Sequence, residues 1–278
     1  MLELYHESCL GCSKLVTNNY STSFSLGIRM FDKRFRDPIY AIYGFVRFAD
    51  EIVDTFHDFD KEELIKKFRS DTFQSIKDGI SLNPILHSFQ QVVHDYQIDS
   101  ELIEGFLVSM EMDLHQKSFD RGEYEKYIFG SAEVIGLMCL KIFVEGDQDE
   151  YEKLKYAAQQ LGSAFQKVNF LRDIQSDYKD RGRVYFPGVN YQQFSNDDKA
   201  KIESEIQSEF DEALIGLKQL PKGSRLGVYV AYLYYSRLLK RIKKFSANEV
   251  LKQRIRISDL NKFLLLIYSA FRYRIKAI

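Results

Sequence analysis

Several residue types are absent or scarce in this sequence of 278 residues, and their absence excludes some kinds of protein. There is no tryptophan, and there are only three cysteines, Cys9, Cys12 and Cys139. So few cysteines cannot build a disulfide framework, and they fit a reduced cytoplasmic protein better. Cys9 and Cys12 form a CxxC pair, but a structural zinc site needs two further ligands, and His6 is the only obvious candidate nearby. We therefore favour neither zinc binding nor dithiol chemistry.

Net charge is also low, at −1. The 39 basic and 40 acidic residues are interleaved, so the chain lacks the basic field that nucleic-acid binding requires. The N-terminus, Met1 to Glu7, lacks the basic and then apolar order of a signal peptide, and no run of about 18 apolar residues suggests a membrane span. We expect a cytoplasmic protein without a nucleic-acid partner.

Helical periodicity covers almost the whole chain, and no strand pattern competes with it. Hydrophobic residues make up 45% of the sequence and no break in composition marks a linker, so we predict one all-α domain over residues 1–278. The prolines stand where helices begin or loops turn, at Pro38, Pro84, Pro187 and Pro221. The predicted helices cover residues 3–17, 38–57, 61–78, 84–97, 99–120, 123–145, 148–178, 196–218, 222–244 and 259–276.

Aromatic residues are abundant, with 22 phenylalanines and 18 tyrosines. At helical spacing such side chains usually belong to a core. They also suit a cavity that receives a long apolar substrate.

The most informative segment is the helix that contains Gln166, Asn169, Asp173 and Asp177. Steps of three and four residues place these four polar side chains on one helical face. Apolar residues flank them, so we expect the two carboxylates to point inward. Buried carboxylates one turn apart need a counter-charge, which is either a network of arginines or divalent cations.

A second helix repeats this arrangement with Tyr43, Arg47, Asp50 and Asp54. A single pair of this kind is usually solvent-exposed or held by arginine, but two such pairs within apolar segments favour a shared function. Four carboxylates at a cavity can hold several Mg²⁺ ions, which keep waters and bridge to substrate phosphates. Bound Mg²⁺ stabilises a diphosphate leaving group, so the site is suited to breaking a C–O bond and forming a carbocation.

These segments resemble the squalene and phytoene synthases, which are head-to-head prenyl transferases. The resemblance covers nearly the whole chain in order, and it implies the isoprenoid synthase fold, a helical bundle around a central hydrophobic cavity. The motifs that carry it are Tyr20 to Ser25, Tyr43 to Asp54, Met112-Asp113, Tyr124 to Met138, Gln166 to Asp177 and Gly182 to Pro187.

The resemblance also assigns roles to single residues. It implies that several Mg²⁺ ions, with Mn²⁺ as an alternative, bind at the two aspartate motifs, which makes these carboxylates catalytic. Tyr43 and Tyr235 are further candidate catalytic residues near the diphosphates and the reacting carbons. The implied metal ligands are Asp50, Asp54, Asn169, Asp173 and Asp177. The implied substrate contacts are Ser21, Ser23, Arg47, Asp113, Gln166, Arg172 and Arg254.

Several of these residues have a second interpretation. Ser21 and Ser23 would look the same as helix caps or turn residues. Arg47 and Arg172 suit diphosphate oxygens, but they would equally serve as structural partners of the aspartates. Tyr235 can be a core tyrosine, and Arg256 can take the place of Arg254.

The chain departs from the family pattern around Ala132. The family usually has Ala-Gly-x-Val-Gly where this sequence has Ala132 to Gly136, with Glu133 in the glycine position. A tyrosine often found three residues before that alanine is here Phe129, which has no hydroxyl. Glu133 is expected either in the cavity wall or at the surface.

The resemblance implies Mg²⁺-dependent condensation of two geranylgeranyl diphosphates to 15-cis-phytoene through a cyclopropyl diphosphate, as part of carotenoid synthesis. Alternatives are a dehydrosqualene or squalene synthase that uses C15 substrates, and a noncatalytic assembly protein of the same fold. A lipid carrier without chemistry would leave four inward aspartates uncompensated. The basic segments Lys240 to Lys244 and Phe271 to Lys276 are either contacts with an anionic membrane surface or solvated helix ends.

Overall fold

The computed structural model describes residues 1–258, 265 and 268–269, without the side chains of residues 22 and 23. The basic segment Phe271 to Lys276 and the side chain of Ser23 therefore lie outside the described residues, as does the predicted helix over 259–276 apart from residues 265, 268 and 269, which are helical.

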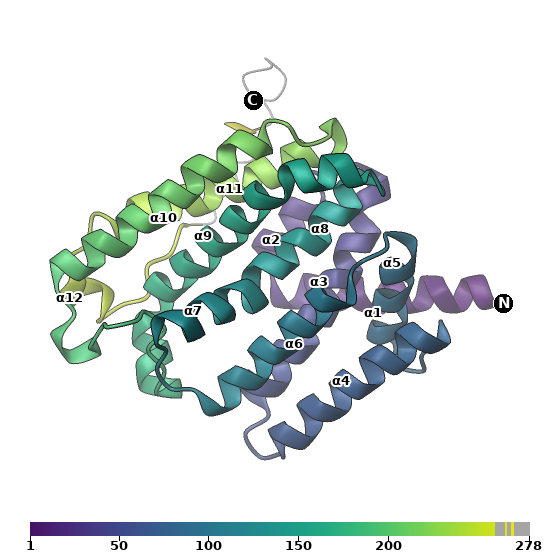
Figure 1. Ribbon diagram of the computed structural model, residues 1–278, viewed down its shortest axis with the longest axis horizontal. Coiled ribbons are helices and arrows are strands. Elements are labelled where there is room, and N and C mark those ends of the chain that lie inside the picture. The colour runs from purple at the N-terminus through teal and green to yellow at the C-terminus, as the bar shows by residue number, and fades with distance from the viewer. Residues whose placement is uncertain (259–264, 266–267, 270–278) are drawn as a thin grey trace.

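Helices make up most of the described chain, as the sequence predicts (Figure 1). They are α1 (Leu2–Tyr20), α2 (Thr22–Ile28), α3 (Lys33–Thr55), α4 (Lys61–Asp78), α5 (Pro84–Asp95), α6 (Ser100–His115), α7 (Arg121–Ile128), α8 (Val134–Val144), α9 (Gln148–Arg181), α10 (Asn196–Leu217), α11 (Lys222–Ile242) and α12 (Ala247–Val250). Within these residues the only β-type pairing is an isolated bridge between Ser118 and Val184.

Helix caps explain why several predicted boundaries are close to the observed ones. Asn83 accepts hydrogen bonds from the first turn of α5, whose first residue is Pro84. Asp120 and Ser195 form capping boxes at the starts of α7 and α10. Gly182 ends α9 with a φ of 67°, a left-handed conformation that glycine adopts without strain.

Three features of the helices differ from the prediction. Pro38 lies inside α3, which begins at Lys33 rather than at the proline. The short helices α2 and α12 were not predicted, because a helix of so few residues has too little periodicity to be recognised in the sequence. The predicted helix over 123–145 is interrupted between α7 and α8 by a π-helical turn, η1 (Phe129–Glu133).

The π-helical turn lies where three helices approach closely. A Cβ on Gly130 would come within 2.7 Å of the Ser109 Cβ on α6, and one on Gly162 of α9 would come within 2.7 Å of the Ala132 carbonyl oxygen. A single π-helical turn inserts one extra residue and rotates the following helix, and such turns are frequent at functional sites. Here the turn itself packs against both α6 and α9.

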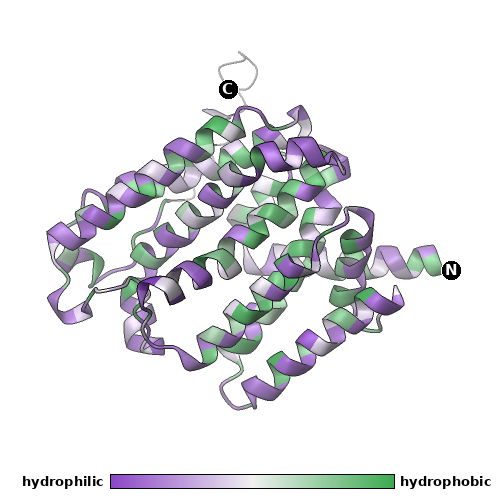
Figure 2. Cartoon of the chain, in the orientation of Figure 1, coloured by the Kyte–Doolittle hydropathy of each residue, from purple (hydrophilic) through white to green (hydrophobic). Residues whose placement is uncertain are grey.

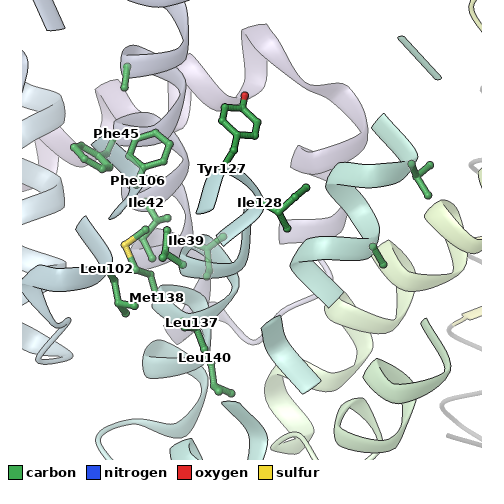
Figure 3. Close-up of a cluster of buried hydrophobic side chains, with 14 of the residues drawn as sticks. Ile39, Ile42, Phe45, Leu102, Phe106, Tyr127, Ile128, Leu137, Met138 and Leu140 are labelled. Atoms are coloured by element: carbon green, nitrogen blue, oxygen red, sulfur yellow. The ribbon is translucent and has the colours of Figure 1, made fainter. Parts of the chain in front are cut away.

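The helices enclose the core in two groups. The long helices α9, α10 and α11 run side by side along one side of the molecule, while α3 packs against α1, α5 and α8 (Figure 1). Polar residues cover the outer faces of helices such as α4 and α10, and apolar residues turn inward (Figure 2). Figure 3 shows part of the core, where Phe45 of α3 lies near Phe106 of α6.

One stretch, Arg121–Val144, is long and apolar enough to cross a membrane by length and composition alone. Its most apolar window is 72% buried inside the protein, which is typical of a core helix. The sequence prediction concerned an uninterrupted apolar run of about 18 residues, and scattered polar residues interrupt this stretch.

Candidate active site

A cavity of about 570 Å³ lies between α3 and η1/α8 on one side and α9, α10 and α11 on the other. Most of its wall is apolar, with small residues such as Gly136, Ala158 and Gly216 between large ones such as Phe31 and Phe143. Cavities of this size hold extended organic ligands. The structure therefore has the central hydrophobic cavity that the sequence resemblance implies.

Polar side chains gather at one end of this cavity. Along α9 the lining changes from Leu154 at the far end to Asn169 and Arg172 near the aspartates. Along α3 the lining residues are Ile39, Tyr43 and Val46, of which Tyr43 carries a hydroxyl. The predicted site residues that line the cavity are Ser21, Tyr43, Gln166, Asn169, Arg172 and Tyr235. Residues predicted from distant segments thus meet at one place.

The first aspartate motif lies just beyond this polar end. Arg47 forms ion pairs with Asp50 and Glu51, and its guanidinium lies over the ring of Tyr20, 4.3 Å from the centroid. Burial, followed by the nearby Asp54, raises the pKa of Asp50 to about 6. Arg47 therefore does not fully compensate the negative charge at this motif.

The second motif carries its own arginines. Asp173 pairs with the neighbouring Arg172 at 2.5 Å and with Arg254 at 2.7 Å. The structure thus places Arg254, rather than Arg256, beside Asp173. Burial, followed by Asp173, raises the pKa of Asp177 to about 7.

Two arginines that the sequence analysis did not single out complete the polar end. Arg181 lies 2.8 Å from Asp54 and 3.1 Å from Asp177, so it contacts both motifs. Arg183 lies 3.3 Å from Asp54 and donates to the backbone carbonyl of Asp113 at 2.7 Å. Arg183 belongs to the Gly182 to Pro187 segment that carries the family resemblance, but its role depends on contacts across more than a hundred residues.

Asp113 is held in a buried network. The hydroxyls of Tyr127 and Tyr185 donate to its two carboxylate oxygens at 2.8 and 3.2 Å, and Arg183 lies 3.3 Å away. Burial raises the pKa of Asp113 to about 6 despite these partners. Asp113 thus lies beside Asp54, outside the cavity lining, and the two tyrosines are further site residues that the sequence analysis missed.

The other predicted residues have local partners. Ser21 caps α2 by accepting from the Phe24 backbone at 3.2 Å, as its alternative interpretation expects, although it also lines the cavity. Tyr235 stacks on Phe165 with a centroid separation of 4.1 Å. Gln166 donates to Ser131 at 3.4 Å.

The residues at the polar end fit a hard divalent cation. The Oδ1 atom of Asn169 is buried without a hydrogen-bond partner, and it shares a helical face with Asp173 and Asp177. Among the described residues no three His, Cys, Asp or Glu side chains stand at metal-binding spacing, and the aspartates of both motifs are paired with arginines. Mg²⁺ needs only one or two carboxylates, because it keeps waters and binds substrate phosphates.

Two open questions from the sequence are answered by the structure. Glu133 does not line the cavity; it accepts a 3.0 Å hydrogen bond from Gln159, and burial raises its pKa to about 7. Phe129 is partly exposed and lies against Gly105 of α6. In the described part of the chain, Cys9, Cys12 and His6 form no metal-binding group.

Comparisons with known proteins support this description. The model of the squalene/phytoene synthase family matches residues 17–261. The chain is 27% identical to 4,4'-diapophytoene synthase of Staphylococcus haemolyticus, covering 89% of this chain and 91% of that protein. It is 23% identical to phytoene synthase of Arthrospira platensis, covering 94% of this chain and 92% of that protein. It is also 26% identical to chloroplastic phytoene synthase 1 of Solanum lycopersicum, covering 86% of this chain but 62% of that longer protein.

Solved structures confirm the predicted fold. A dehydrosqualene synthase superposes with a TM-score of 0.82 over 97% of this chain and 98% of the other, at 18% identity. A squalene synthase from Alicyclobacillus acidocaldarius gives a TM-score of 0.76, covering 87% of this chain and 95% of the other, also at 18% identity. Because the family model spans most of the sequence, the chain belongs to the squalene/phytoene synthase family of head-to-head prenyl transferases.

Proposed function

We propose that this chain is a Mg²⁺-dependent 15-cis-phytoene synthase that joins two molecules of geranylgeranyl diphosphate. The observation that carries the proposal is the position of two aspartate motifs at the polar end of a long apolar cavity. This arrangement places a diphosphate among charged groups and its prenyl chain among apolar ones.

In the proposed site the aspartates and the Oδ1 atom of Asn169 hold Mg²⁺, which supplies the charge that stabilises the departing diphosphate. The arginines supply the rest of the positive charge. Arg47 and Arg172 are paired with aspartates of the two motifs. Their fork-shaped guanidinium groups also suit diphosphate oxygens, which compete with these aspartates when substrate binds.

The cavity wall is suited to the carbocation that remains. Tyr43 stacks on Phe24, and Tyr235 stacks on Phe165, so aromatic faces lie close to the polar end. Aromatic faces attract cations, and the apolar wall further in excludes water that would quench them.

The proposed reaction has two steps. Loss of diphosphate from one substrate gives an allylic cation, and the double bond of the second substrate captures it with loss of a proton to form a cyclopropylcarbinyl diphosphate. A second loss of diphosphate, rearrangement and loss of a proton then give a conjugated triene. The products are therefore one triene, two diphosphates and two protons.

Two observations support C20 substrates. The lining of α9 runs from Leu154 to Asn169, fifteen residues or about 22 Å of helix, which gives room for a long chain. Two of the relatives described above are named phytoene synthases. The second candidate is a C15-using dehydrosqualene synthase, which is favoured by the Staphylococcus haemolyticus relative because it is named 4,4'-diapophytoene synthase.

Product analysis tests the proposal. Purified protein and Mg²⁺ are incubated separately with geranylgeranyl and farnesyl diphosphate, without and with NADPH. We expect a C40 triene from the C20 substrate, independent of NADPH. A C30 triene alone would favour the second candidate, and squalene formed only with NADPH would assign a reductive final step.

The variants Asp50→Asn and Asp173→Asn are assayed beside the wild type, because each removes one negative charge from one motif. Either substitution is expected to abolish product. Full activity in both would contradict the proposed metal site. A cytoplasmic location and contact with a membrane surface stay predictions.

A further inference from the structure

Arg181 contacts one carboxylate of each aspartate motif. Its Nη2 lies 2.8 Å from Oδ2 of Asp54 on α3, and its Nη1 donates to Oδ1 of Asp177 on α9 at 3.1 Å. Residues of α3 and α9 face each other across the cavity. The guanidinium of Arg181 therefore links the two walls at the polar end.

The bridge lies on the solvent side of the carboxylates. The side chain of Arg181 is 40% exposed, whereas those of Asp54 and Asp177 are 15% and 7% exposed. An ion pair that water reaches on one side is weaker than a buried one, and it is therefore the easier of the two to break. Arg181 is also the last residue of α9, and the hydrogen bonds and ion pairs of its guanidinium go to Asp54 and Asp177.

Arg183 provides a contrast on the same carboxylate. It lies 3.3 Å from Oδ1 of Asp54, but its side chain is only 9% exposed. It also donates to the hydroxyl of Tyr185 and to the backbone carbonyl of Asp113. Breaking these contacts would leave buried polar groups unpaired, so Arg183 is a fixed structural partner.

The carboxylate oxygens that a metal ion would bind already form ion pairs with the arginines. Arg181 binds Oδ2 of Asp54 and Arg183 binds Oδ1, so a cation that binds Asp54 directly competes with one of the two for the oxygen and is repelled by its positive charge. Arg181 is the more exposed and has the fewer partners. Displacing it would release an oxygen on each of the two motifs at once.

We propose that Arg181 is a resident counter-charge that holds the two aspartate motifs together in the metal-free protein and is displaced when Mg²⁺ binds. Arg181 is then a positioning residue that competes with the metal. The inference rests on the proposed Mg²⁺ site. Its test distinguishes a failure of the role of Arg181 from a failure of the metal site itself.

The test is a Mg²⁺ titration followed by thermal unfolding, without substrate, starting from protein in EDTA. The variants are Arg181→Gln and Arg183→Gln, with Arg34→Gln as a control because Arg34 forms an exposed pair with Glu145 away from the site. For Arg181→Gln we expect a lower Tm in EDTA. We also expect the Mg²⁺ concentration of half-maximal stabilisation to fall by roughly three- to tenfold, because a partly exposed ion pair no longer competes.

The other variants are expected to behave differently. Arg183→Gln should lower the Tm with and without Mg²⁺, and Arg34→Gln should leave both the Tm and the Mg²⁺ midpoint close to wild type. If Arg181→Gln does not fold, Arg181→Lys is titrated instead. An ammonium lacks the two separate Nη donors that Arg181 places on Asp54 and Asp177, so the bridge should weaken and the midpoint should again fall.

Two results would overturn the inference. If wild-type protein responds to Mg²⁺ but the midpoint of the Arg181 variant is unchanged or higher, Arg181 does not compete with the metal, and the proposed metal site stands. If millimolar Mg²⁺ does not stabilise the wild type even with added inorganic pyrophosphate, the proposed metal site fails as well.

Discussion

The hydroxyl of Tyr127 donates a 2.8 Å hydrogen bond to Oδ2 of Asp113, and both side chains are buried. Tyr127 comes from α7 and Asp113 from the last turn of α6, so the bond joins two helices next to the first aspartate motif. In Figure 3 the ring of Tyr127 points away from the cluster formed by Ile39, Ile42 and Met138.

Substituting Tyr127→Phe is expected to destabilise the protein, because a buried carboxylate oxygen loses its donor. The cost of an unsatisfied buried group is about 1–3 kcal/mol, which lowers the Tm by several degrees. Thermal unfolding measures it, with Tyr156→Phe on the exposed face of α9 as the matched control. Equal Tm values for both variants would show that the bond contributes nothing.

Glu133 gives a pH-dependent prediction. Burial raises its pKa from 4.5 to about 7, so the folded state binds a proton that the unfolded state has released between these values. Stability from this group is therefore present below about pH 4.5 and is lost as the pH rises to about 7. Glu133→Gln removes the effect and keeps an acceptor for Gln159.

The measurement is the Tm of wild type and Glu133→Gln between pH 5 and 8. The Tm of the variant minus that of the wild type should grow by a few degrees as the pH rises. A difference that stays constant over this range would contradict the raised pKa of Glu133.

Arg254 and Arg256 form a matched pair for testing the second motif. Both are exposed residues of one segment, but Arg254 lies 2.7 Å from Asp173, whereas Arg256 forms no ion pair among the described residues. Because the Arg254 side chain is 47% exposed, loss of this ion pair costs on the order of 1 kcal/mol, so Arg254→Gln should lower kcat/KM by about fivefold. Arg256→Gln should retain activity. If Arg256→Gln instead loses activity and Arg254→Gln retains it, Arg256 is the arginine that acts at the site.

Cys139 lies in the apolar part of the cavity wall, one helical turn from Phe143. A larger side chain there shortens the space for a prenyl chain, so Cys139→Phe should reduce product from C20 substrate more than product from C15 substrate. Steric exclusion of a few methylenes changes the ratio of the two kcat/KM values by about tenfold or more. The exposed Ile215→Phe is the control, and an unchanged ratio would show that the chain does not reach Cys139.

The two aspartate motifs could be predicted because each lies within one long helix, where steps of three and four residues define a face. The arginine partners could not, since Arg181 reaches Asp54 across 127 positions of sequence and no local pattern records that contact. The π-helical turn was missed for a similar reason, because it depends on close contacts of Gly130 and Gly162 with other helices.

Pro38 shows a different limit. A proline inside a helix removes one backbone hydrogen bond, so sequence rules place it at a helix start. Here it stands in the second turn of α3, whose flanking residues Phe35 and Ile39 are buried in the core. Tertiary packing therefore compensates for the missing bond, and no local rule predicts that.

The central claim is that the two aspartate motifs act together on two prenyl diphosphates. Its most direct test is to measure, in one reaction with geranylgeranyl diphosphate and Mg²⁺, the diphosphate released and the C40 triene formed. The account predicts two diphosphates per triene, with both products absent in Asp50→Asn and in EDTA. One diphosphate released per C20 alcohol, without triene, would show that the site ionises its substrate without joining two chains and would contradict the account.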